Sequence, residues 1–291
     1  MYELIRSGER TYYVDCPSRM GVYLTDAGAC LIDSGNDREA GKKFLKILDQ
    51  NGWKPRMILN THSHSDHIGG NQLIHQRTRC PIYAPGVDRA MVEFPILEPS
   101  FLYGGNPPGP LRNKFLLAQE SPAQPLTEGV LPEGMTMKRL DGHAMAMAAF
   151  RTPDGVWFLA DALASQAVLE KYHISFLYDV RGYLASLDEV QKLEGALFVP
   201  AHAQPTEDVR PLVTMNRDKT YEIIDLVLGL CARPVSFEAL FKRVFDHYAL
   251  AMDFNQYVLA GSTLKSYLTY LLEEGRVSAR FEDNLLLWQA A

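Results

Sequence analysis

The chain of 291 residues contains only four cysteines, and no two of them form a C-x-x-C pair. Single thiols spread along a chain favour reduced side chains over a disulfide framework or a thiolate metal site. No stretch is long and apolar enough to span a bilayer, and the first residues lack the apolar segment of a signal peptide. We therefore expect a folded, cytoplasmic protein without a membrane anchor. The four thiols are Cys16, Cys30, Cys80 and Cys231.

Positive charge is also scarce. Lys and Arg together number 29 against 35 Asp and Glu, a net charge of −6, so the chain has no general positive field for nucleic acid or anionic lipid. Hydrophobic residues make up 47% and charged residues 22%, which excludes a disordered or fibrous chain. The length predicts one or two domains.

Strand and helix patterns alternate over the first 210 residues, which predicts an α/β layered architecture. We expect a hairpin turning at residues 26–28, a helix over 38–50 and a strand over 156–160. The insertion at about 86–134 is rich in proline, so regular structure should not continue through it. Because it also carries many aromatic and aliphatic residues, we expect a packed flap.

The last part of the chain, residues 211–291, is expected to form a second, small and mostly helical domain. Helical patterns at 220–231, 236–248 and 255–274 precede two strand-like runs, an order that is similar to a winged helix. Eight basic against ten acidic residues leave this region without the basic face that duplex DNA requires. We expect it to support dimerisation or to close the site, and a homodimer is one open option.

Histidine is sparse as well, but three of the eight histidines fall in one short stretch. Residues 61–70 read Thr-His-Ser-His-Ser-Asp-His-Ile-Gly-Gly, which places His62, His64, Asp66 and His67 in an H-x-H-x-D-H pattern. Alternate residues of an extended loop point to one side, so the first three of these side chains aim together. Imidazole and carboxylate are ligands that zinc prefers and that iron or manganese accept. The pattern predicts a metal site.

This stretch resembles the signature loop of the metallo-β-lactamase superfamily, and most of residues 15–205 follow that family's order of elements. Shorter resemblances are found at Leu31-Ile32-Asp33-Ser34-Gly35, Gly142-His143, Ala160-Asp161 and Pro200-Ala201-His202. The resemblance implies a four-layer αββα sandwich of the metallo-β-lactamase type over residues 1–210, with a lid-like insertion. One departure is Ala144-Met145-Ala146-Met147, where the family often continues with Thr-Pro-Gly, and it predicts an apolar wall beside the site.

The resemblance also implies two divalent metal ions, zinc first and iron or manganese as alternatives. One ion would be held by His62, His64 and His143, and the second by Asp66, His67 and His202, with Asp161 bridging the two. Asp66 would also act in catalysis by orienting the attacking water. Asp33 would steady the ligands through hydrogen bonds, although a structural ion pair is an open alternative for it.

Further candidate residues lie in the stretch 171–181. His173, Tyr178 and Arg181 could contact substrate oxygens, and a surface loop with packed aromatics is the alternative.

Two metal ions can hold a bridging hydroxide and polarise a carbonyl oxygen. The predicted function is therefore metal-dependent hydrolysis of a small ester, thioester or lactone by that hydroxide. Open alternatives are a phosphodiesterase or ribonuclease of the same superfamily, an iron-dependent thiol oxygenase, and a non-catalytic metal-binding module. The expected partner is a small-molecule substrate, because the net charge weighs against nucleic acid.

Overall fold

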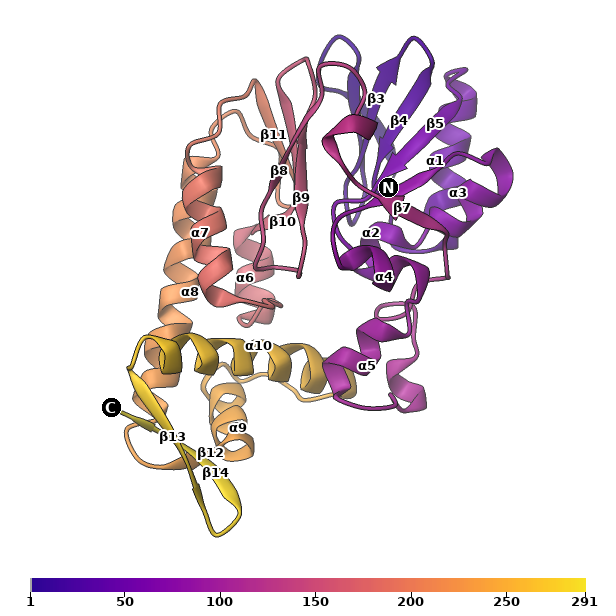
Figure 1. Ribbon diagram of the computed structural model, residues 1–291. Helices are drawn as coiled ribbons and strands as arrows, with labels where there is room; N and C mark the ends of the chain where they lie inside the picture. Colours follow the sequence, from indigo (N-terminus) through magenta and orange to yellow (C-terminus); the bar gives the residue numbers. More distant parts are fainter. Residues whose placement is uncertain (1) are drawn as a thin grey trace.

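The structure, a computed structural model, describes residues 2–291 and arranges them around two β-sheets (Figure 1). The first sheet has seven strands in sequence order. It begins as an antiparallel meander and becomes parallel from β4 onward. Its strands are β1 (Glu3–Arg6), β2 (Thr11–Asp15), β3 (Met20–Thr25), β4 (Gly28–Ile32), β5 (Pro55–Leu59), β6 (Ile82–Ala84) and β7 (Ala123–Pro125). The predicted hairpin is formed by β3 and β4.

The second sheet has four strands in the order β11-β10-β9-β8. They are β8 (Thr136–Arg139), β9 (Ala148–Arg151), β10 (Val156–Ala164) and β11 (Leu197–His202). The inner faces of the two sheets form one hydrophobic cluster, in which Tyr23 and Leu59 of the first sheet lie with Phe150 and Phe158 of the second. This cluster fixes the two sheets against each other.

Helices cover the outer face of each sheet (Figure 1). On the first sheet, α1 (Arg38–Gln50) is capped by Asp37, whose side chain accepts from Ala40 N, and it buries Phe44 and Leu48. Next to it lie the short α2 (Ser65–Ile68) and α3 (Asn71–Thr78). The second sheet is covered by α6 (Gln166–Tyr172), α7 (Val180–Val190) and α8 (Arg210–Leu230). The predicted α/β class with an αββα sandwich is confirmed.

The insertion is more regular than the proline content predicts. It forms α4 (Asp88–Glu93), α5 (Leu97–Tyr103), two 3-10 turns (Gly109–Leu111 and Glu128–Val130) and β7. β7 is the last strand of the first sheet and pairs in parallel with β6. An edge strand pairs on one side only, so Pro125 can end it without breaking a ladder. The insertion is thus built into the sandwich at this edge.

The C-terminal region begins earlier than the helical pattern predicts. α8 starts at Arg210, ten residues before the expected helix. Pro211 is compatible with this start, because a proline in the first turn removes no intrahelical hydrogen bond. α9 (Phe237–His247) and α10 (Phe254–Glu273) follow, with a small sheet of β12 (Val235–Ser236), β13 (Val277–Glu282) and β14 (Leu285–Ala290). Their order agrees with helices followed by a hairpin.

The C-terminal helices share a hydrophobic cluster with the second sheet. Leu187 of α7, Ile224 of α8 and Leu268 of α10 are all completely buried in it. The domain boundary at residue 210 remains a prediction. α8, which begins there, packs in the same cluster as the second sheet and as α10. Among residues 2–291, none of the helices combines the length and apolarity that crossing a membrane requires.

We expect Phe150→Ala to lower the free energy of unfolding by about 3–5 kcal/mol, because it empties a fully buried site between the sheets. Urea denaturation followed by fluorescence measures the change. Phe281→Ala is the control: this side chain on β13 is 79% exposed, and its removal should stay within about 0.5 kcal/mol. Equal effects of the two variants would contradict the assigned core.

Candidate metal centre

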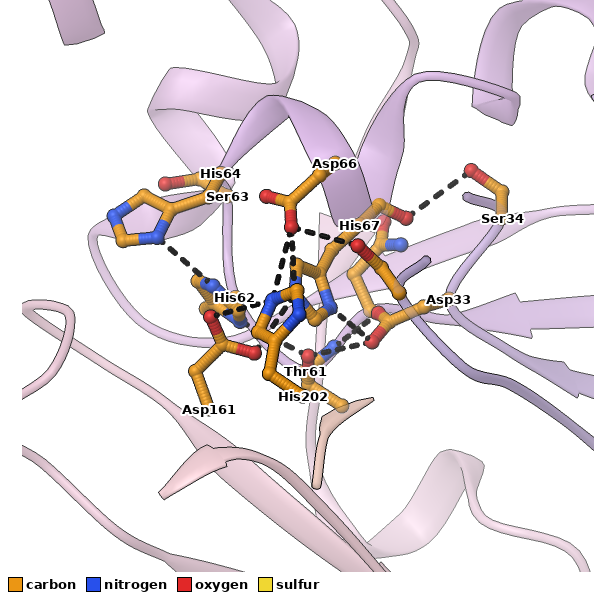
Figure 2. A network of polar contacts seen from close by, with 12 residues as sticks. Asp33, Ser34, Thr61, His62, Ser63, His64, Asp66, His67, Asp161 and His202 are labelled. Carbon is orange, nitrogen blue, oxygen red and sulfur yellow. Dashed lines mark hydrogen bonds and ion pairs between the residues drawn. The ribbon is translucent and has the colours of Figure 1, made fainter. Parts of the chain in front are cut away.

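The predicted ligands of the first sheet come from one loop and one helical turn. His62 and His64 lie in the loop that follows β5, and α2 then carries Asp66 and His67. Figure 2 shows these four side chains turned toward a common space, with Asp161 and His202 reaching it from the second sheet. The sequence pattern therefore places its residues together in space as well as along the chain.

The second sheet contributes three more side chains. His143 lies in the connection from β8 to β9, and His202 is the last residue of β11. Asp161 lies within β10, whereas the sequence places it just after the strand. The register between β10 and β11 shifts on both sides of Ala160, whose φ is +49°. Such a bulge changes the direction of the following side chain, here Asp161.

Three histidine nitrogens converge in the first part of the cluster. His62 Nε2 and His143 Nε2 each lie 3.0 Å from His64 Nδ1. A ring nitrogen carries at most one proton, so His64 Nδ1 cannot satisfy both neighbours by donation. Burial lowers the pKa of all three imidazoles, to about 4 for His64 and about 3 for His143, and so they are neutral at pH 7. Neutral nitrogens aimed at one point fit a cation.

The second part of the cluster pairs two imidazoles with two carboxylates. His67 Nε2 lies 2.9 Å from Asp161 Oδ1, and His202 Nε2 lies 3.1 Å from Asp66 Oδ2. Burial opposes a proton on His67, yet Asp161 and Asp66 raise its pKa well above the ordinary value. Asp161 likewise raises the pKa of His202 to about 10. The two carboxylates thus favour a positive charge between themselves and the two imidazoles, and a divalent cation can supply that charge.

Asp161 connects the two parts. Its carboxylate belongs both to the group of His62, His64 and His143 and to the group of Asp66, His67 and His202, and the ligand atoms of each group lie within 4.8 Å of one another. His67 Nε2 and Asp161 Oδ1 lie 2.9 Å apart without hydrogen-bond geometry, and within the described chain neither buried atom has another hydrogen-bond partner. Orphaned polar atoms at the centre of a buried cluster fit metal coordination.

Asp33 supports the cluster through contacts with Thr61 and His67. Its Oδ1 accepts from Thr61 N at 2.8 Å, and its Oδ2 accepts from Thr61 Oγ1 at 2.7 Å and faces His67 Nδ1 at 2.8 Å. The N–H at His67 Nδ1 donates to Asp33 Oδ2, and this contact orients the ring so that Nε2 faces Asp161. Asp33 takes a left-handed backbone with φ +59° immediately after β4, which turns its side chain toward the loop. The two interpretations of Asp33 from the sequence, a hydrogen-bonding support and an ion-pair partner, both stay predictions.

Two buried carboxylates of the insertion were not predicted from the sequence. Asp88 accepts from Ser63 N, Ser63 Oγ and Ala146 N, each at 3.0 Å, and so joins the loop of the first sheet to the loop of His143. Glu98 Oε1 lies 3.6 Å from His64 Nε2. Burial raises the pKa of both carboxyl groups to about 7. The sequence offered one signal for Glu98: it is the single acidic residue in the mostly apolar segment 94–102.

The three residues predicted to contact substrate lie in different parts of the structure. Tyr178 lines a small pocket beside His64. His173 instead stacks on Tyr248 with ring centroids 4.2 Å apart. Arg181 lies at the start of α7 and pairs with Glu274 at 2.6 Å. The structure therefore brings Tyr178 near the cluster, and it places His173 and Arg181 against the C-terminal helices.

The sandwich and the cluster define a class of protein, an αββα scaffold with a histidine and carboxylate centre at the ends of its sheets. The family model of the metallo-beta-lactamase superfamily matches residues 13–202. The chain belongs to the metallo-beta-lactamase superfamily. The residues that could hold metal ions all lie within the matched segment.

Two similar curated sequences carry the same description. A hydroxyacylglutathione hydrolase of Rhodospirillum rubrum is 38% identical over 74 residues, covering 23% of this chain and 28% of that protein. A hydroxyacylglutathione hydrolase of Methylococcus capsulatus is 42% identical over 68 residues, covering 23% and 27%. The chain thus matches little more than a quarter of the length of these curated relatives.

Similar solved structures extend over nearly the whole chain. A beta-lactamase domain protein from Burkholderia ambifaria has a TM-score of 0.76 at 19% identity, covering 99% of this chain and 94% of that one. A metallo-beta-lactamase family protein from Thermus thermophilus has a TM-score of 0.73 at 18% identity, covering 97% and 99%. At these identities the likeness concerns the fold, and it includes the C-terminal helices.

We expect Asp33→Asn to weaken binding of a divalent metal by about 10–100-fold, because an amide cannot accept all three hydrogen bonds that orient the loop and His67. Asparagine tolerates the left-handed backbone, so the fold should persist. Competition with a chromophoric chelator measures the affinity. Asp26→Asn, in an exposed turn, should bind like the wild type. Unchanged affinity in Asp33→Asn would contradict the role given to Asp33.

Proposed function

We propose that the protein is a dinuclear metal-dependent hydrolase of a small thioester, ester or lactone. The observation that carries the proposal is the sharing of Asp161 between two groups of potential ligands. The sequence relatives described as hydroxyacylglutathione hydrolases support the thioester among these substrate classes.

In this proposal, His62, His64 and His143 would hold one ion, Asp66, His67 and His202 the other, and Asp161 both. Five imidazoles and two carboxylates suit zinc, and they accept iron or manganese. When bound, the ions supply a hydroxide nucleophile near neutral pH and polarise the carbonyl oxygen of the substrate.

Asp66 is the residue that we assign to orienting the attacking water. Its side chain is 37% exposed, against 10% for Asp161, so it is the carboxylate that solvent reaches. Ser18 Oγ donates to Asp66 Oδ2 at 2.7 Å and fixes the rotamer. His67 and the hydrogen bond from His202 outweigh burial and hold the pKa of Asp66 low, so it remains an acceptor.

The C-terminal helices support the rim of the site. Thr263 Oγ1 of α10 accepts from Leu177 N at 3.1 Å, and Ser266 Oγ donates to Tyr178 O at 2.6 Å. These contacts fix the loop of Phe176 and Tyr178 beside the cluster. We therefore assign this region to closing the site around a small-molecule substrate. The net charge of −6 weighs against a nucleic-acid phosphodiester, because the chain has no general positive field to attract it.

We expect the metal-loaded protein to hydrolyse a small acyl thioester, and Asp161→Ala to lower kcat/KM by about 100-fold or more, because the metal ions contribute several kcal/mol to the reaction. Thiol release measures the rate, and elemental analysis measures the metal content, which should fall below two equivalents in the variant.

The matched control is Asp188→Ala on α7, whose carboxylate is exposed and pairs with Arg217. It should keep both rate and metal content. Activity that survives both a chelator and Asp161→Ala would overturn the proposed function.

A further inference from the structure

The candidate ligand His202 ends a strand at the edge of the second sheet. This strand, β11, pairs with β10, and on that side His202 O accepts from Ser165 N at 3.2 Å. Successive carbonyl groups of an extended chain point to opposite sides, so Ala201 O and Ala203 O point away from β10. Carbonyl groups at a sheet edge need a donor from outside the sheet.

That donor comes from the first sheet. Arg19, in the connection from β2 to β3, donates through Nη1 to Ala201 O at 3.3 Å and to Ala203 O at 2.5 Å. Its Nη2 lies 2.8 Å from Asp15 Oδ1, which balances the charge of the guanidinium. The Arg19 side chain is only 8% exposed. A buried guanidinium thus holds the backbone on both sides of His202.

The residue before Arg19 contacts a second ligand of the same group. Ser18 Oγ donates to Asp66 Oδ2, and this oxygen lies 3.1 Å from His202 Nε2. Figure 2 shows Asp66 and His202 turned toward each other from the two sheets. Among the described residues, neither Ser18 nor Arg19 makes a side-chain hydrogen bond to the group of three histidines. The connection from β2 to β3 therefore supports one half of the metal centre.

We propose that Arg19 is a positioning residue, and that it determines how tightly the His202 site holds its metal ion. The His202 site is the group of Asp66, His67 and His202 together with the shared Asp161. This inference rests on the proposed function and concerns one of its two ions. A ligand that is fixed before the ion arrives loses less conformational freedom on binding, so loss of the guanidinium should weaken this site and leave the other unchanged.

Release of metal from the full chain loaded with Co²⁺ tests the proposal without measuring turnover. Competition with a chromophoric chelator gives the affinity of each equivalent, and the visible absorption of Co²⁺ reports its ligands. Arg19→Met keeps an unbranched side chain but removes the donors. We expect it to bind one equivalent about 10–100-fold more weakly and to keep the affinity and spectrum of the other. Arg10→Met is the matched control: this guanidinium pairs with Asp26 at the surface, and both equivalents should bind as in wild type.

His202→Ala identifies the equivalent that is affected. It removes the side chain that Arg19 positions, so Arg19→Met should cause no further loss in the His202→Ala background. Arg19→Lys keeps the charge and the apolar stem, which protects the fold, but lysine ends in one nitrogen and cannot reproduce the planar arrangement of donors. We expect it to weaken the same equivalent by a smaller factor.

The outcomes separate this inference from the proposed function. If the pattern is found but no thioester is hydrolysed, the proposed function fails and the inference stands. If Arg19→Met weakens both equivalents alike, or if its effect adds fully to that of His202→Ala, Arg19 acts only on the general structure and the inference is overturned. Wild-type affinity in Arg19→Met overturns it as well. If Arg19→Met does not fold, Arg19→Lys decides: a selective loss supports the inference, and an equal loss or none overturns it.

Discussion

The site depends on one electrostatic constraint: Asp161 is buried among His67, His143 and His202, and all of these groups must be kept at contact distance. The partners come from both sheets, so the contact distances persist only if the sheets cannot slide. The hydrophobic cluster between the sheets provides that rigidity, and Asp33 supplies the local part by fixing the loop after β5. A buried carboxylate that lost these partners would be costly, and the packing of the sandwich and the chemistry of the site therefore support each other.

The sequence predicts the part of the site that is local. His62, His64, Asp66 and His67 are close along the chain, and an extended loop followed by a helical turn brings them together without any long-range contact. His143, Asp161 and His202 required the family resemblance, because nothing in their own segments shows where those segments pack. The bulge that directs Asp161 depends on the pairing of β10 with β11 and has no signal in the sequence of either strand.

The other differences between the predicted and the observed structure also arise from long-range packing. Proline in residues 86–134 predicts irregular structure, yet the free edge of β6 organises this segment into the strand β7. A charge within such a segment is expected to be exposed, and Asp88 and Glu98 are buried only because the insertion folds back over the loops of the site. His173 and Arg181 lie close to Tyr178 along the chain, but they pack against the C-terminal helices. Lys219 of α8 contacts the His173 ring, and Glu274 at the end of α10 pairs with Arg181.

Asp88 also fixes the position of the insertion at the rim of the site. It lies at the start of α4 and accepts hydrogen bonds from the loops of both sheets, so the beginning of the insertion is tied to the scaffold. α5 is held as well, because Glu98 faces His64 at 3.6 Å and Leu102 is buried against Val258 of α10. A single carboxylate that belongs to neither sheet thus keeps the two loops of the site in register.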